Sequence, residues 1–360
     1  WNVCDQNLAW EKGAALFGER SKNYWTQEAG RHLLVFVPAE ACNGGGLGTV
    51  GNGIASGGLT WSVVDTGSSA DYWDGVLFHE FGHNISLHHS NLRSCSAPAV
   101  DSALDGWGGL SNPSCSDLQY ADVFDVMGGG QIVTDWNGGI LLSNLNNVAE
   151  LNVSHKAQLG SLGSDLRTVD VDSGGYEQTV TIQGAGAGLG TRGLRVVDPT
   201  SNEQLYIEYR SGGGRDANTF YTGFLAATGS DRIAPGVRVQ RLYSKATGQF
   251  GPVNGSIGLQ VQGGQQLHPY LRAGDQLRAH TGNVTISVIS TTATTATIKV
   301  DFYQPFTTRP SPTISVVGGG TAWAGKTLTV TGADPNSWAP AAAQVEYQWF
   351  RAGQAIPGAT

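Results

Sequence analysis

Four of the eight histidines in this chain lie within the eleven residues from His79 to His89, in the string HEFGHNISLHH. His79 and His83 are four residues apart, so on a helix their side chains lie on one face and point the same way. Two imidazoles in this arrangement can bind one metal ion. If His89 is to reach the same ion, the helix has to end near Ser86 and the chain has to turn back.

The donor set of this segment is that of a catalytic zinc site. Three neutral histidine nitrogens and one open coordination position are what catalytic zinc needs. Glu80 follows the first histidine, where it projects beside the metal without binding it and can move a proton from water to a leaving amine. We therefore expect His79, His83 and His89 to hold one zinc ion, with Glu80 as the general base. The alternative third ligand is His88, which we expect to be a loop residue beside the site.

The pattern H-E-x-x-H-x-x-x-x-x-H resembles the signature of the metzincin zinc peptidases. The wider string HEFGHNISLHHS is similar to the gametolysin subgroup, in which Asn follows the second histidine and Ser follows the third. Metzincins also have a Met-turn below the metal. The single Met of this chain, Met127, lies in the Gly-rich string DVFDVMGGG, 38 positions after His89. The resemblance covers residues 30–160 and implies that Met127 lies beneath the metal; the alternative is a methionine that fills the core.

The sequence departs from the family pattern at Ser86, because metzincins usually have Gly three residues after the second histidine. Gly is favoured there because it tolerates left-handed backbone angles. A Ser in that conformation costs roughly 1–2 kcal/mol. Either zinc binding offsets this cost or the turn has a different geometry.

Residues near the Met-turn are candidates for supporting roles. Asp122 and Asp125 either orient a ligand histidine or, as we expect, cap the turn. Tyr120 is a candidate for stabilising the oxyanion, although nothing in the sequence fixes its position. The resemblance also implies that strand 59–64 is the edge strand that pairs with extended substrate. The remaining histidines are isolated, and we expect structural or exposed positions for them: His32, His155, His268 and His280.

Composition and charge exclude several partners. The net charge is −8 and no run of Lys or Arg occurs, so nucleic acid and anionic membrane surfaces are poor partners. No stretch of about 18 apolar residues is present, so we expect no membrane span. The sequence has no D-x-D-x-D-G loop, which leaves a calcium site without support. It carries no signal for an oligomeric state.

The four cysteines favour an oxidising, extracellular compartment. An even count in a Gly-rich chain with 14% charged residues favours two disulfides, and three pairings are open. We expect Cys95–Cys115 and Cys4–Cys42; the alternative is four buried thiols. The chain begins at Trp1 without a signal-peptide pattern, so we expect that a leader has been removed. We expect a secreted protein.

Residues 1–160 mix helix and strand signals. Apolar spacing near the helical period, short apolar runs and Gly-rich segments alternate along them. They predict a helix over 7–29, a strand over 33–37, a strand over 59–64, a helix over 71–87 and mostly loop over 91–147. With the resemblance, this predicts an α+β metzincin-like catalytic domain over 1–160.

Residues 161–304 have a different character. Short β-branched, alternating segments separated by Gly, Asp, Asn and Pro predict an all-β sandwich domain. The segment QLYIEYR, 204–210, alternates as expected of a half-buried strand. A Pro/Thr linker is predicted at 305–313. Residues 314–360 resemble a partial bacterial Ig-like β module in GKTLTVTG and QWFRAGQAIPGAT, which implies a bacterial source.

The expected function is that of a secreted zinc-dependent endopeptidase acting on extracellular proteins or glycoproteins. The rival is a secreted adhesin or glycan-binding protein with an inactive zinc domain, for which exposed Tyr206, Tyr221 and Tyr270 would supply the binding surface. The intact Glu80 argues against it, because a structural zinc site needs no base. A zinc hydrolase that acts on a non-peptide amide is a third alternative.

Overall fold

The chain folds into two compact units, Trp1–Phe302 and Tyr303–Thr360. The computed structural model describes residues 5–25, 30–38, 45–64, 70–103, 110–129, 148–228, 230–247, 251–263, 266–303, 310–323, 325–332, 334–338, 348–351 and 354–356. The protein is mostly β, with few helices. Within these ranges, no helix is both long and apolar enough to cross a membrane.

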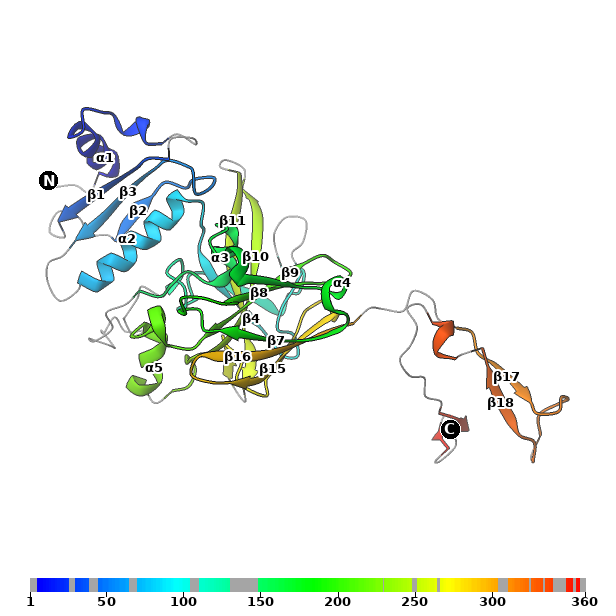
Figure 1. The fold of residues 1–360 in the computed structure, drawn as a ribbon. Coiled ribbons are helices and arrows are strands. Elements are labelled where there is room, and N and C mark those ends of the chain that lie inside the picture. The colour runs from blue at the N-terminus through cyan, green and yellow to red at the C-terminus, as the bar shows by residue number, and fades with distance from the viewer. Residues whose placement is uncertain are drawn as a thin grey trace. The chain divides into compact units, whose positions relative to one another are not determined.

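The first layer of the large unit is a three-stranded sheet between two helices (Figure 1). Its order is β1 (His32–Pro38), β3 (Gly58–Val64) and β2 (Gly46–Gly48), with β1 parallel and β2 antiparallel to β3. Helix α1 (Gln6–Ala15) covers one face, and helix α2 (Ala70–Asn84) lies on the other. The strands predicted at 33–37 and 59–64 and the helix predicted at 71–87 are thereby confirmed.

Two expectations for this layer are wrong. The helix predicted over 7–29 ends at Ala15, and a short 3-10 helix, η1 (Ser21–Asn23), follows. The strand predicted as the edge, β3, is the central strand, and β2 forms an edge instead. The sequence did not predict β2, because this segment is Gly-rich. Glycine is required at position 48, since a Cβ there would lie 2.1 Å from the Glu80 carbonyl oxygen.

The second layer is a sandwich of two sheets, as predicted for the β-region. The seven-stranded sheet has the order β5 (Cys115–Leu118), β4 (Ser90–Cys95), β11 (Gly251–Leu259), β10 (Gly236–Thr247), β9 (Gln204–Arg210), β8 (Gly193–Val197) and β6 (Leu166–Val169). The four-stranded sheet has the order β14 (Gln276–Arg278), β15 (Val284–Thr291), β16 (Thr295–Phe302) and β7 (Glu177–Gln183). Leu194, Ile207 and Val239 of the first sheet pack with Ile182, Ile286 and Ile298 of the second in one apolar core.

The remaining elements are short. In the large unit they are α3 (Val153–Gln158), η4 (Gly163–Asp165), α4 (Val171–Gly174), η5 (Gly214–Asp216), α5 (Phe220–Thr228), β12 (Val261–Gly263) and β13 (Gln266–His268). In the small unit they are β17 (Thr313–Val316), β18 (Leu328–Thr331), η6 (Pro335–Ser337), β19 (Phe350–Arg351) and β20 (Gln354–Ala355). β17 pairs with β18 and β19 pairs with β20, in two separate hairpin-like sheets.

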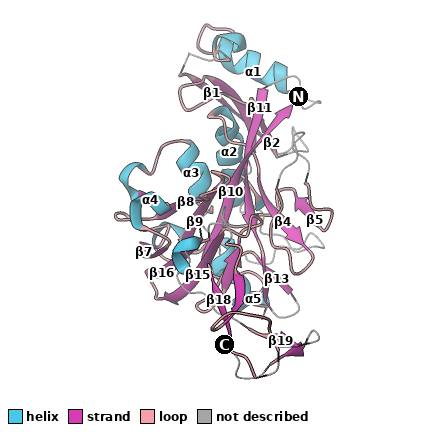
Figure 2. Ribbon diagram, turned by 90° about the vertical axis from the view of Figure 1, so that its right-hand side faces the viewer, coloured by secondary structure: helices cyan, strands magenta, loops and turns pink. Residues whose placement is uncertain are grey.

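The segment predicted as mostly loop contains two strands, β4 and β5, at one edge of the seven-stranded sheet (Figure 2). Their sequences lack apolar alternation, and side-chain links hold them instead. Cys95 and Cys115 face each other across the pair and form the predicted disulfide. Arg93 donates to Asp117 at 2.8 Å. The second predicted pair, Cys4–Cys42, lies outside the described residues.

The seven-stranded sheet takes strands from both sides of the boundary predicted at 160/161. β4 and β5 precede that boundary, and the other strands of the sheet, between 166 and 259, follow it. β4 pairs in parallel with β11, and Ser90 lies opposite Ser256. The residues predicted as a catalytic domain therefore share a sheet with the residues predicted as a separate sandwich domain.

The second face of the seven-stranded sheet is polar and buried. The alternation in β9 predicted a half-buried strand, but Tyr206, Glu208 and Arg210 are 5%, 1% and 0% exposed. The prediction is wrong because a further layer, containing α3, covers this face. The charges on it are neutralised, since Arg210 donates to Glu208 at 2.8 Å and to Asp216 at 2.9 Å. One sheet thus carries an apolar core on one face and a network of ion pairs on the other.

Candidate metal centre

Helix α2 places the first two histidines. His79 and His83 lie one turn apart on one face of this helix, as the spacing predicts, and are only 3% and 8% exposed. Their ring centroids are 4.9 Å apart. Both rings are oriented by backbone acceptors, because His79 Nδ1 lies 2.8 Å from the Val126 carbonyl oxygen and His83 Nδ1 lies 2.8 Å from that of Leu87. Donation from Nδ1 leaves each Nε2 as an acceptor that can bind a metal.

The chain turns back immediately after α2 and brings in the third histidine. The backbone N–H of Ser86 donates to the His83 carbonyl oxygen, and that of Leu87 donates to Gly82. This pair of bonds is a Schellman motif, which requires a left-handed residue after the helix. Ser86 occupies that position with φ of 86°. The expected helix end near Ser86 is confirmed, and of the two turn geometries that the sequence left open, Ser86 adopts the left-handed one.

The turn brings three imidazoles together. One ring nitrogen from each of His79, His83 and His89 lies within 4.8 Å of the others, close enough to hold one metal ion. The His89 ring centroid is 5.4 Å from that of His79 and 5.0 Å from that of His83. Among the described residues this group contains His89 and not the alternative His88.

Burial keeps the three rings in the neutral form that metals bind. Burial, followed by the neighbouring histidines, lowers the pKa of both His83 and His89 to about 3. The pKa of His79 is also lowered, with burial as the main cause. An imidazole that is neutral at physiological pH needs no deprotonation before it binds a metal. The three neutral ring nitrogens therefore fit a transition-metal ion, and zinc is among the ions that imidazole binds.

Glu80 lies beside this group on the same helix. Burial raises the pKa of its carboxyl group to about 7, and a hydrogen bond from the Gly48 backbone N–H acts in the opposite direction. Gly46 also lies against this side chain, because a Cβ at position 46 would be 3.0 Å from Glu80 Cγ. The edge strand β2 thus passes directly over the carboxylate.

Tyr120 is the nearest aromatic neighbour of the three histidines. Its ring centroid is 3.8 Å from that of His89, and 40% of the residue is exposed. Burial, followed by the charge of Glu80, raises the pKa of its phenol. Tyr120 has φ of 58°, a left-handed conformation that is uncommon outside glycine. The structure thus places beside the site a residue whose position the sequence left open.

Met127 packs against the underside of α2. It is fully buried with Leu87 and Val126. Gly82 makes the contact close, since a Cβ at that position would lie 2.3 Å from the Met127 sulfur. The sulfur therefore lies beneath the helix turn that carries His79 and His83. Met127 thus belongs to a buried apolar cluster and also lies against the last turns of α2.

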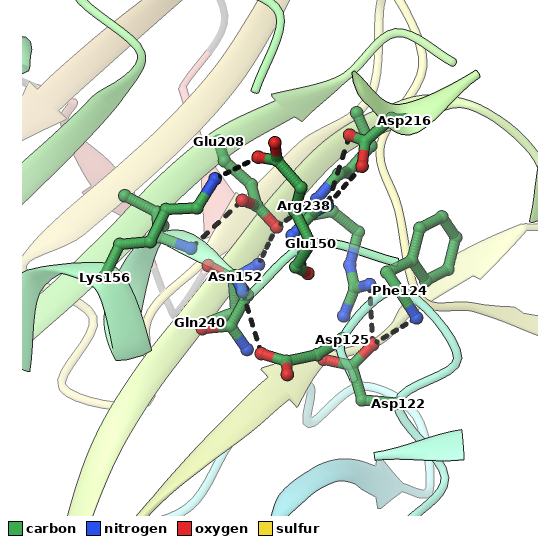
Figure 3. Close-up of polar contacts among 12 residues, drawn as sticks. Asp122, Phe124, Asp125, Glu150, Asn152, Lys156, Glu208, Asp216, Arg238 and Gln240 are labelled. Carbon is green, nitrogen blue, oxygen red and sulfur yellow. Dashed lines mark hydrogen bonds and ion pairs between the residues drawn. The ribbon is translucent and has the colours of Figure 1, made fainter. Parts of the chain in front are cut away.

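The two aspartates of this segment cap its backbone, as expected. Asp122 accepts from the Phe124 N–H at 3.1 Å, and Asp125 accepts from the Met127 N–H at 2.7 Å. Asp122 is also paired with Arg238 at 2.8 Å. Arg238 belongs to β10, so the sheet holds the Met127 segment through its polar face. Figure 3 shows the contacts of Asp122 with Phe124 and Arg238, and that of Asp125 with Asn152.

Sequence reasoning missed Asn84 as a structural residue, although its place after His83 contributed to the resemblance. Asn84 is fully buried and joins α2 to the sheet beside it. Its side-chain amide donates to the Thr49 carbonyl oxygen at 2.8 Å and to that of Leu59 at 3.1 Å, and Thr60 donates to its Oδ1 at 3.0 Å. These bonds fix the strands β2 and β3 relative to the metal-binding helix.

The isolated histidines have structural partners. His32 Nδ1 lies 3.3 Å from Asn84 Oδ1, His280 is paired with Glu203, and His268 is buried beside Tyr270. His155 is fully buried, with Nδ1 2.9 Å from Asp125 Oδ2. Nothing in its local sequence signals this contact, because the two residues lie 30 positions apart.

Comparison with known proteins finds no matching family model, no matching curated protein and no matching solved structure. The fold and the site therefore define the class by themselves. The chain is a mostly β protein in which three histidines lie close enough to bind one metal ion.

Proposed function

We propose that the protein is a secreted zinc-dependent endopeptidase with a metzincin-like catalytic domain. Its substrates are extracellular proteins or glycoproteins. The observation that carries the proposal is the grouping of His79, His83 and His89, with the half-buried Glu80 carboxylate on the helix that bears the first two. The Cys95–Cys115 disulfide agrees with an oxidising compartment.

In the proposed reaction the metal and the residues of the chain have different roles. The three histidines would hold a zinc ion, which would polarise the scissile carbonyl and lower the pKa of the attacking water to about 7. The rings of His79 and His83 hold their orientation through the Val126 and Leu87 carbonyl oxygens.

Glu80 supplies the proton transfers. Its carboxylate accepts a proton from the attacking water as the new C–O bond forms, and it delivers that proton to the amine nitrogen as the C–N bond breaks. The Gly48 N–H holds the carboxylate in place between the two transfers.

The edge strand β2 supports an extended peptide as the substrate. Among the described residues β2 is an edge strand of its sheet, so its outward backbone groups other than the Gly48 N–H, which bonds Glu80, can pair with an added strand. The role that the sequence assigned to strand 59–64 therefore passes to β2. Tyr120, whose ring centroid lies 3.8 Å from that of His89, is the candidate for contact with the reacting carbonyl.

The residues proposed for the alternative adhesin function are buried. Tyr206, Tyr221 and Tyr270 were expected to form an exposed aromatic surface, but they are 5%, 0% and 2% exposed. Each lies within a core cluster of the large unit. Buried rings cannot stack on a sugar.

The test compares the full chain with its Glu80→Gln variant for zinc content and for cleavage of an unfolded protein. The control is Glu177→Gln, which changes an exposed carboxylate on β7 that is paired with Lys299. We expect about one zinc per chain in all three proteins, and a loss of cleavage of about 100-fold or more only in Glu80→Gln. Equal cleavage by Glu80→Gln, zinc-loaded wild type without peptidase activity, or a wild type that binds no zinc would each contradict the proposal.

A further inference from the structure

We propose that helix α3 is a positioning element of the metal centre, in which His155 and Gln158 hold the two turns that orient the metal-binding histidines. The inference rests on the proposed function only in that a metal occupies the three-histidine group. His155 and Gln158 are three residues apart and so lie on one face of the helix. They lie more than 60 positions beyond His89 in the sequence.

The first series of hydrogen bonds links His155 to His79. His155 Nδ1 lies 2.9 Å from Asp125 Oδ2, and both side chains are 0% exposed. The other oxygen of Asp125 accepts from the Met127 N–H at 2.7 Å, which fixes the peptide between Val126 and Met127. The carbonyl oxygen of that peptide, on Val126, is the acceptor for His79 Nδ1. The imidazole of His155 therefore fixes, through one carboxylate, the group that orients the first ligand.

The second series of hydrogen bonds links Gln158 to the turn at Ser86. Gln158 Nε2 donates to the Ser86 carbonyl oxygen at 3.1 Å and lies 3.4 Å from Ser86 Oγ. The carbonyl held by Gln158 belongs to the peptide that leads into Leu87. The Leu87 carbonyl oxygen in turn accepts from His83 Nδ1. Gln158 thus holds a strained turn that orients the second ligand and leads to the third, His89.

Helix α3 is itself bonded to the seven-stranded sheet. The sheet therefore fixes the position of His155 and Gln158. The Asn152 side chain caps the helix by accepting from the His155 N–H at 3.0 Å. The Val153 N–H donates to Glu208 on β9 at 3.0 Å (Figure 3). Val153 also packs with Tyr206 of the same strand. One side of α3 is therefore bound to the rigid sheet, and the other supports the two turns.

The predicted effect is on metal affinity. Loss of a group that orients a metal ligand typically weakens binding roughly 10–100-fold. His155→Leu removes the donor to Asp125, and Gln158→Leu removes the donor to Ser86. His155→Asn is the conservative variant, because its amide N–H can take the place of Nδ1–H.

The control is a residue of the same helix that contacts neither turn. Lys156 pairs with Glu150 at 2.5 Å, so Lys156→Met removes an ion pair from α3 but leaves the two turns intact. All variants are made in the full chain. Zinc affinity is measured by competition with a chelating dye. The visible spectrum of the cobalt-substituted protein reports ligand geometry, which a loss of overall stability alone does not alter.

We expect His155→Leu and Gln158→Leu to bind zinc roughly 10–100-fold more weakly and to shift the cobalt spectrum. His155→Asn and Lys156→Met should stay within about threefold of wild type, with an unchanged spectrum. If His155→Leu does not fold, Gln158→Leu decides by the same measurements. Wild-type affinity and spectrum in the leucine variants, or an equal loss in Lys156→Met, overturn the proposal for α3 and leave the proposed function intact. A wild type that binds no zinc overturns both.

Discussion

Replacing Ser86 with glycine should stabilise the protein. Ser86 has φ of 86°, a value at which the Cβ of an L-residue crowds the backbone. The Schellman bonds from Ser86 to His83 and from Leu87 to Gly82 are backbone bonds, and a glycine keeps both of them. The substitution therefore removes the strain without removing the turn.

The size of the effect follows from three contributions. Relief of the left-handed conformation gains about 1–2 kcal/mol. The greater freedom of glycine in the unfolded chain costs roughly 0.4–1 kcal/mol. The hydroxyl group contributes little, because Gln158 Nε2 lies 3.4 Å from Ser86 Oγ but 3.1 Å from the carbonyl oxygen, which glycine keeps. We expect a net gain of about 0.5–1 kcal/mol in the free energy of unfolding.

The assay is urea unfolding of the metal-free full chain, with Ser86→Ala as the matched control. Alanine removes the hydroxyl group but keeps the Cβ, so its strain is that of serine. We expect Ser86→Ala within about 0.5 kcal/mol of wild type and Ser86→Gly above both. The reasoning is refuted if Ser86→Gly is no more stable than Ser86→Ala.

Three further predictions concern other parts of the large unit. Gly82→Ala should destabilise it by about 1–3 kcal/mol in urea unfolding, because the new Cβ would lie 2.3 Å from the sulfur of the buried Met127. Replacing Cys95 and Cys115 together with serine should cost about 3 kcal/mol in the same assay, since the disulfide spans a sequence separation of 20 residues. Burial acts to raise the pKa of Asp198, but hydrogen bonds to its carboxylate outweigh it and lower the pKa from 3.8 to about 2. The ionised group therefore adds stability that is fully present above about pH 4 and is lost as the pH falls towards 2, so the deficit of Asp198→Asn in urea unfolding should shrink over that range.

Strands with their own β-branched alternation were predictable, whereas strands that depend on partners were not. The segments of β7, β15 and β16 carry this pattern and form one sheet. β11 and β4 do not carry it, because their pairing is decided by neighbours distant in the sequence. At Gly258 of β11, for example, a Cβ would lie 2.5 Å from a guanidinium nitrogen of Arg238, so a glycine that resembles a turn signal is a packing requirement.

The grouping of the three histidines was predictable because it depends on residues that are close together in the sequence. The spacing of His79, His83 and His89, with a helix end between them, needs only one helix and one turn. The residues that hold this geometry were not predictable from the sequence alone. Gln158 reaches Ser86 over a separation of 72 positions, and a lone glutamine carries no pattern that points to such a contact.

The third ligand shows why the local pattern is insufficient to build the site. The carbonyl oxygen of His89 accepts from the Ser256 N–H on β11 at 3.2 Å, and the next residue, Ser90, donates its N–H to the Met127 carbonyl oxygen at 2.8 Å. The backbone on either side of the His89 side chain is thus fixed between the sheet and the Met127 segment. His79 and His83 need only α2 to share a face, whereas the backbone at His89 is also held by a strand more than 160 residues further along the chain. The position of His89 therefore depends on contacts from distant parts of the large unit, among them the parallel pairing of β4 with β11, and these contacts carry no local sequence signal.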